Sequence, residues 1–149
     1  MTGAPDWPDH IGWDLARAAE LWKRMFRARM VALGYDWYGE ARGRLMQHIG
    51  PSGLNQSELA RRTGHSKQAI QQMVDTLEAE GVVARIPDKR DARQKRVVLS
   101  EQGLAFQTDG TRIKAEIEEE LRARMGDAGF DALRTGLKSL LDAQGWSGI

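Results

Sequence analysis

The segment 54–99 constrains this 149-residue chain most, because it predicts two short helices, a tight turn and a basic hairpin in immediate succession. Asn55 can cap the first turn of a helix, and Glu58 stands three residues later, where a capping box places its acidic member. Gly64 supplies the left-handed residue that ends a short helix. The sequence therefore predicts a first helix between Asn55 and Gly64.

A second helix is predicted to begin directly afterwards, with Ser66 as its N-cap and Gly81 at its end. Its apolar residues follow the i, i+3, i+4, i+7 spacing of a buried helix face: Ile70, Met73, Val74 and Leu77. The opposite face is polar and carries Lys67, Gln68, Gln71, Gln72 and Asp75. Two helices joined by so short a turn cross steeply, which buries both apolar faces and exposes this polar one. The pattern is that of a helix-turn-helix.

The polar face of the second helix has residue types that suit the major groove of DNA. Glutamine offers a donor and an acceptor to an adenine edge, lysine reaches guanine or phosphate, and a helix N-terminus favours phosphate. The alternative is an ordinary solvated helix face, since short helix-turn-helix patterns also arise by chance in helical proteins.

The hairpin after the second helix favours the DNA-binding interpretation. Val82–Ile86 and Lys95–Leu99 read as antiparallel strands around a polar loop, which together form a wing. Residues 81–99 contain six basic and two acidic residues, which gives this segment a local charge of +4. The net charge of the whole chain is +1. Such a concentration is typical of a DNA-binding face, although a loop of solvated charges is the alternative. The candidate DNA contacts are Ser66, Lys67, Gln68, Gln71, Gln72, Arg90, Arg93 and Lys95.

The same segment resembles the MarR family of winged helix-turn-helix transcriptional regulators. The matching residues are Leu54, Glu58, Leu59, Ala60, Ser66, Val74, Leu77, Glu78, Gly81, Val83, Arg85, Asp88, Asp91, Arg93, Leu99, Ser100 and Gly103. The spacing from Asp91 through Arg93 to Gly103 is the most specific part. The resemblance implies that Asp91 braces the wing and that Arg93 enters the minor groove. The family often has a second arginine where this chain has Ala92.

Long amphipathic helices are predicted on both sides of this unit. One runs from Ile11 to Leu33 before Gly34, a second follows the N-cap Ser100 and ends at Gly126, and a third carries Phe130, Leu133, Leu137, Leu140 and Leu141 in a near-heptad pattern. A small winged module does not need these apolar faces, so we expect them to form a dimer interface.

The expected fold is mainly α with a small β-hairpin: a winged helix-turn-helix domain plus a helical dimerisation domain formed by the N- and C-terminal helices. The chain is expected to be a single MarR-like domain over 1–149, with the DNA-binding part at 35–100 and the dimerisation part at 10–34 and 101–145. A two-fold homodimer would hold its recognition helices about 34 Å apart, which predicts double-stranded DNA with a pseudo-palindromic operator as the partner.

Composition excludes several other classes of protein. No apolar stretch approaches the roughly 20 residues that span a membrane, and the N-terminal residues lack the features of a signal peptide, so we expect no membrane partner and a cytoplasmic location. The absence of cysteine excludes disulfides and the thiol switch of the peroxide-sensing branch of the resembled family. The three histidines are scattered, and no catalytic, cofactor or metal motif is found. We therefore do not expect an enzyme.

Aromatic residues gather in the N-terminal quarter of the chain and suggest a sensor pocket. These are Trp7, Trp13, Trp22, Trp37 and Tyr38, of which the last four are the candidate effector-pocket residues. Stacked rings suit a planar effector, but they could equally fill a dimer core. The predicted function is a sequence-specific, dimeric repressor released from an inverted-repeat operator by a small effector, for which an aromatic compound is the candidate. The alternative is a winged helix module that binds another protein.

Overall fold

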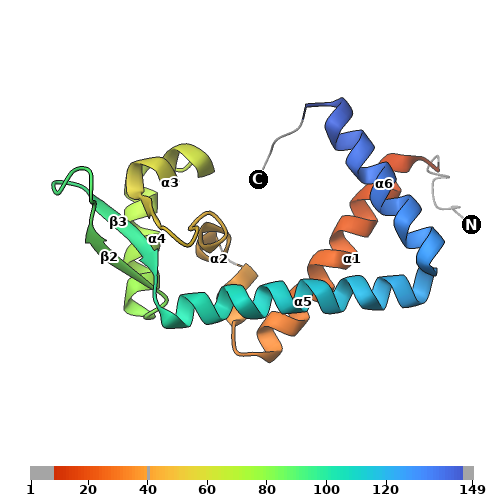
Figure 1. The fold of residues 1–149 in the computed structure, drawn as a ribbon, viewed down its shortest axis with the longest axis horizontal. Coiled ribbons are helices and arrows are strands. Elements are labelled where there is room, and N and C mark those ends of the chain that lie inside the picture. Colours follow the sequence, from red (N-terminus) through yellow and green to blue (C-terminus); the bar gives the residue numbers. More distant parts are fainter. Residues whose placement is uncertain (1–8, 40, 146–149) are drawn as a thin grey trace, which may run out of the picture.

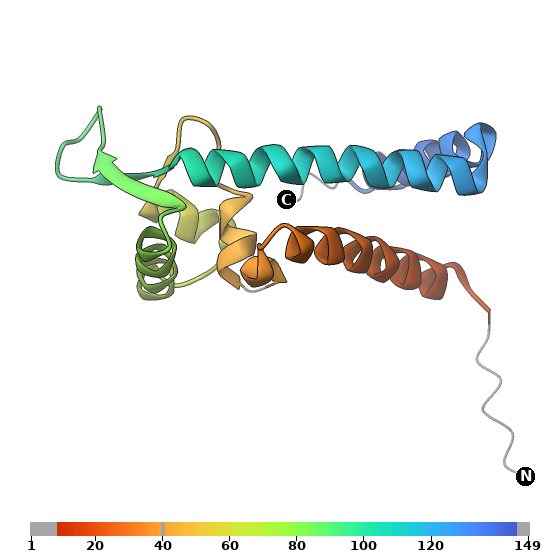
Figure 2. The same ribbon diagram turned by 90° about the horizontal axis from the view of Figure 1, so that it is seen from below.

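The computed structural model describes residues 9–39 and 41–145 and shows an elongated molecule with the wing at one end (Figure 1). The elements follow in the order α1 (Ile11–Ala32), the 3-10 helix η1 (Asp36–Gly39), α2 (Ala41–Met46), β1 (Leu54–Asn55), α3 (Gln56–Thr63), α4 (Lys67–Ala79), β2 (Val83–Pro87), β3 (Lys95–Leu99), α5 (Glu101–Met125) and α6 (Asp127–Ala143). Helix α1 runs beside α5, which links the wing end to α6 (Figure 2).

The helix-turn-helix of α3 and α4 forms as predicted, because its ends are specified locally. The side chain of Asn55 accepts a hydrogen bond from the Glu58 backbone amide, and the hydroxyl of Ser66 accepts one from the Ala69 amide. Gly64 ends α3 in the left-handed region with φ of 71°. The expected reach of the Glu58 carboxylate back to the cap is replaced by hydrogen bonds that it accepts from two arginines in the following turn.

The wing is part of a three-stranded antiparallel sheet in the order β1-β3-β2. β2 and β3 pair with Val83 opposite Leu99 and Pro87 opposite Lys95, so β2 is shifted by one residue from the predicted strand. β1 was not predicted; it pairs Leu54 with Val97 through a contact far apart in sequence. This third strand anchors the wing to the start of α3.

The core lies within the winged part and the adjoining half of the long helices. The predicted apolar face of α4 is buried, with Ile70, Val74 and Leu77 at 0% exposure. In contrast, large apolar side chains on the outer helices are exposed: Ile11, Trp13, Leu21, Val31, Leu33, Leu104, Met125, Leu133, Leu137, Leu140 and Leu141. No helix within residues 9–39 and 41–145 is long and apolar enough to cross a membrane.

Two close contacts fix α5 against the winged part. A Cβ on Gly103 would lie 2.1 Å from the backbone oxygen of Val82, so only glycine lets α5 begin this close to the residue that precedes β2. Further along, the ring of Phe106 stacks on Trp37 with centroids 5.0 Å apart and meets Tyr35 edge to face. The first half of α5 therefore belongs to the same core as α4 and the sheet.

Candidate nucleic-acid interface

The outer face of α4 is exposed and polar along its first two turns. Lys67, Gln68, Gln71 and Gln72 are all exposed, while Ser66 uses its hydroxyl as the N-cap. The helix N-terminus adds unpaired backbone amides to this face, which favours a phosphate oxygen nearby. The predicted contacts on α4 thus lie together on one exposed surface.

The six basic side chains of the wing fall into two groups. Lys89, Arg90, Arg93 and Lys95 are exposed around the tip. Arg85 and Arg96 turn inward instead, and the Arg85 side chain is only 10% exposed. The local charge of +4 counted from the sequence includes these two arginines, whose charge is paired with carboxylates and is not part of the exposed tip.

Arg96 holds the wing to the loop before β1. Its Nη1 donates to the backbone oxygens of Ser52 and Gly53, both at 2.8 Å, and its Nε lies 3.3 Å from a carboxylate oxygen of Asp88. Asp88 is 8% exposed, which is rare for a carboxylate and is made possible by this pairing.

Two aspartates shape the wing tip through backbone hydrogen bonds. Asp88 accepts from the Arg90 amide at 2.8 Å, and this bond, with the nearby Arg96 charge, lowers the pKa of the Asp88 carboxyl. Asp91, the predicted brace, is exposed and accepts from the Arg93 amide at 3.0 Å. The buried role of Asp88 was missed, although an aspartate after proline in a loop typically makes such a turn.

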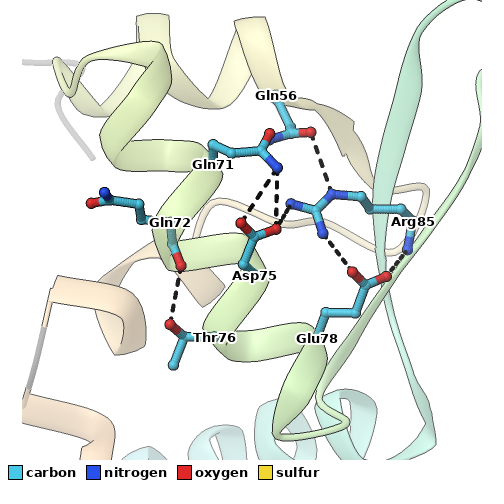
Figure 3. Close-up of polar contacts among 7 residues, drawn as sticks. All are labelled: Gln56, Gln71, Gln72, Asp75, Thr76, Glu78 and Arg85. Atoms are coloured by element: carbon cyan, nitrogen blue, oxygen red, sulfur yellow. Dashed lines mark hydrogen bonds and ion pairs between the residues drawn. The ribbon is translucent and has the colours of Figure 1, made fainter.

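Arg85 joins β2 to the outer face of α4 (Figure 3). Its guanidinium donates to Asp75 at 2.6 Å and to Glu78, and its backbone amide donates to Glu78 at 3.2 Å. Asp75 and Glu78 lie one helical turn apart, so a single arginine pairs with both carboxylates on the face that carries the candidate DNA contacts and offsets one of their two negative charges. This arrangement places the wing at a fixed distance from α4.

Three of the four candidate effector residues, Trp22, Trp37 and Tyr38, pack against the core in one aromatic cluster, and Trp13 lies apart from it. Trp22 stacks on Phe26 with centroids 5.2 Å apart, Trp37 stacks on Phe106, and Tyr38 meets Phe26 edge to face. Burial raises the pKa of the Tyr38 hydroxyl. Trp13 is 46% exposed near the start of α1, and Trp7 lies outside the described residues.

An open groove of about 360 Å³ lies between α1 and α5 and is lined by other residues: Leu21, Arg24, Met25, Ala28, Arg29, Glu120 and Arg124. Glu120 forms ion pairs with Arg29 and Arg124 at its edge. Among residues 9–39 and 41–145, no group of three or more His, Asp or Glu side chains is placed to hold a metal ion.

Comparisons with known proteins agree with this geometry. The sequence model of the MarR family matches residues 41–94, which span α2 to the wing tip. The reduced form of MarR from E. coli is 20% identical with a TM-score of 0.72, over 91% of this chain and 99% of that chain. A structure of S. aureus MepR with DNA is 16% identical with a TM-score of 0.68, over 89% and 98% of the two chains.

MepR bound to ethidium bromide is also similar, at 16% identity and a TM-score of 0.63, over 91% of this chain and 97% of that chain. These likenesses cover about nine tenths of the chain, so the fold of these proteins extends beyond the winged part into the long outer helices.

Proposed function

We propose that this chain, whose residues 41–94 match the MarR family model and whose fold is that of MarR, is a homodimeric winged helix-turn-helix repressor of transcription that binds a pseudo-palindromic DNA operator. The observation that carries the proposal is the exposed polar face of α4 beside the exposed cations of the wing tip. The first group suits base edges in a major groove, and the second suits phosphates and a neighbouring minor groove. That MepR has been seen with DNA supports this use of the fold.

In this docking α4 enters the major groove and the wing lies along the adjacent backbone. Lys67, Gln68, Gln71 and Gln72 contact base edges or nearby phosphates, while Arg90 and Lys95 contact phosphates. Arg93 enters the minor groove, and Asp91 holds its backbone in place. Under this proposal Arg93→Ala weakens binding to a degree that depends on the sequence in the minor groove, because groove width and potential depend on sequence.

Dimerisation is proposed through the outer helices, the parts 10–34 and 101–145. The α6 leucines Leu133, Leu137, Leu140 and Leu141 are 38–47% exposed although they recur on one side of the helix. Burying such a face against a second copy removes apolar surface from water at about 25 cal/mol per Å². Leu137→Glu is expected to shift the protein from dimer to monomer in sedimentation velocity, whereas the neighbouring exposed Lys138→Glu should leave the dimer intact.

A small planar effector is proposed to bind near the aromatic residues Trp13, Trp22, Trp37 and Tyr38 and to change the spacing of the two recognition helices. The binding of ethidium by MepR supports a planar aromatic ligand. Such a ligand releases the operator only by its differential affinity for the two spacings. Titrating planar aromatic compounds, with ethidium as the first probe, should quench tryptophan fluorescence and weaken operator binding together. The effector proposal fails if a broad panel leaves operator affinity unchanged.

The test of the repressor proposal is a fluorescence anisotropy titration at two salt concentrations. The purified protein is titrated against duplex DNA from upstream of its own gene and from a genome-wide selection of bound fragments, with scrambled duplexes as controls. Tight, salt-sensitive binding to particular duplexes is expected. Equal and weak binding to selected and scrambled duplexes would refute the proposal and favour a winged helix module that binds another protein.

A further inference from the structure

Four side chains on α3, α4 and β2 close a ring of hydrogen bonds on the outer face of α4 (Figure 3). Arg85 Nε donates to Gln56 Oε1 at 3.4 Å, and Gln56 Nε2 donates to Gln71 Oε1 at 2.9 Å. Gln71 Nε2 donates to Asp75 Oδ1 at 3.1 Å, and Arg85 Nη2 donates to the same oxygen at 2.6 Å. The ring joins three elements that are separate in sequence.

The charged members of this ring fix the orientation of its two amides. A guanidinium can only donate hydrogen bonds, and a carboxylate can only accept them. Gln56 must therefore turn its oxygen toward Arg85, which leaves its nitrogen to face Gln71. Gln71 in turn must present its oxygen to Gln56 and its nitrogen to Asp75. Rotating either amide by 180° would bring two donors or two acceptors together, so the ring has one stable polarity.

Gln71 keeps hydrogen-bonding capacity beyond the ring. Its amide has two N–H groups and two lone pairs. Nε2 donates to both carboxylate oxygens of Asp75, at 3.1 and 3.4 Å, a bifurcated contact that a single N–H can make, and Oε1 accepts one hydrogen bond from Gln56. The remaining N–H and lone pair are the complement of an adenine edge in the major groove, which offers N7 as acceptor and N6 as donor. The ring thus settles the orientation of this amide before any DNA is bound.

Gln72, the next residue on α4, provides a contrast. Its side chain extends to the side of the helix away from Arg85 (Figure 3), and the hydrogen bond it forms uses its backbone oxygen, which accepts from the Thr76 hydroxyl. Ordering a free glutamine side chain on binding costs rotamer entropy, whereas a side chain that is already held loses less.

We infer that Gln56 and Arg85 are positioning residues for base recognition, which hold the Gln71 amide in the orientation that selects one base pair. This inference rests on the proposed DNA-binding function and extends it to two residues behind the DNA-facing surface. Gln56 is half-buried at the start of α3, and Arg85 is nearly covered, so their effect on recognition passes through Gln71.

The experiment measures base preference rather than overall affinity. Duplexes carrying each single base-pair change in the selected operator are titrated by anisotropy against the full-length wild-type protein, Gln71→Ala, Gln56→Leu and the double variant. Gln56→Leu removes both ring hydrogen bonds of residue 56 without changing any charge. Ser57→Ala, at the exposed neighbouring position, is the matched control. Gln56→Ser is a second ring-breaking variant, and thermal unfolding confirms that each variant is folded.

The expected result is that Gln71→Ala lowers the preference at one base pair by about fivefold or more, the lower end of the range for a bidentate contact. Gln56→Leu and Gln56→Ser should lower the preference at that same base pair at least about twofold, with no further loss in the double variant. Ser57→Ala should keep the wild-type preference.

Three outcomes would overturn the inference, and they are distinguishable. If the Gln56 variants keep the wild-type preference at the base pair that Gln71 selects, the ring does not position Gln71 for base recognition, while the repressor proposal stands. If the wild-type protein is sequence-specific but Gln71→Ala changes none of its base preferences, Gln71 does not recognise a base. The inference then fails while the repressor proposal stands. A wild-type protein without base preference overturns both.

Discussion

Replacing Arg90 by alanine tests which wing cations face DNA. The structure leaves four cations exposed around the tip and pairs Arg85 and Arg96 with carboxylates. If Arg90 and Lys95, the two proposed phosphate contacts of the wing, each neutralise one phosphate, the wing contributes a slope of about −1.8 per subunit to log K against log salt, from roughly 0.9 per phosphate. The substitution keeps the backbone amide from which Asp88 accepts, so the tip should keep its shape.

In a dimer, Arg90→Ala removes one phosphate contact from each subunit and should make the slope shallower by about 1.8. Raising salt from about 50 to about 200 mM should then weaken the variant about twelvefold less than the wild type. The assay is anisotropy with the selected operator over a series of salt concentrations. Lys138→Ala is the charge-matched control, since α6 lies at the opposite end of the subunit from the wing (Figure 1).

An unchanged slope for Arg90→Ala, or an equal change for Lys138→Ala, would refute the assignment of the exposed tip cations to phosphates.

Three further predictions concern stability. Phe106→Ala should lower the free energy of unfolding by about 3–5 kcal/mol in urea denaturation, because a buried ring packed among aromatic residues is lost; a change below about 1 kcal/mol would contradict this packing. Gly103→Ala should cost at least about 1–3 kcal/mol by pushing α5 from the residue before β2, whereas Gly136→Ala, with no atom of its own subunit near the added Cβ, should be neutral or stabilising by up to about 1 kcal/mol. The pKa of Glu58 is lowered to about 2 by its two arginine partners, so its contribution is present above about pH 4.5 and is lost as pH falls toward 2. Glu58→Gln should therefore lower Tm near neutral pH, and its difference from the wild type should shrink over that acidic range; a constant difference would contradict the shift.

The sequence alone determined the features that depend on neighbouring residues. The caps Asn55, Ser66 and Ser100 each accept a hydrogen bond from an amide three residues later, as their residue types predict. Gly64 and Gly81 lie at or just after helix ends and have positive φ, a conformation that residues with a side chain rarely adopt. The buried face of α4 and the two strands of the wing follow from short-range periodicity. These elements could be predicted because their causes lie within a few residues.

The tertiary structure alone decided which polar side chains face outward. Local sequence does not distinguish Arg85 and Arg96, which turn inward, from Arg90 and Arg93, because their partners come from other elements. β1 also depends on the tertiary structure, since a two-residue strand exists only when β3 lies beside it. The burial of the α6 leucines is likewise a tertiary outcome, since they stay 38–47% exposed in the subunit although they recur on one side of the helix. Charge and hydrophobicity are properties of residues, whereas pairing and burial depend on contacts that the folded chain creates.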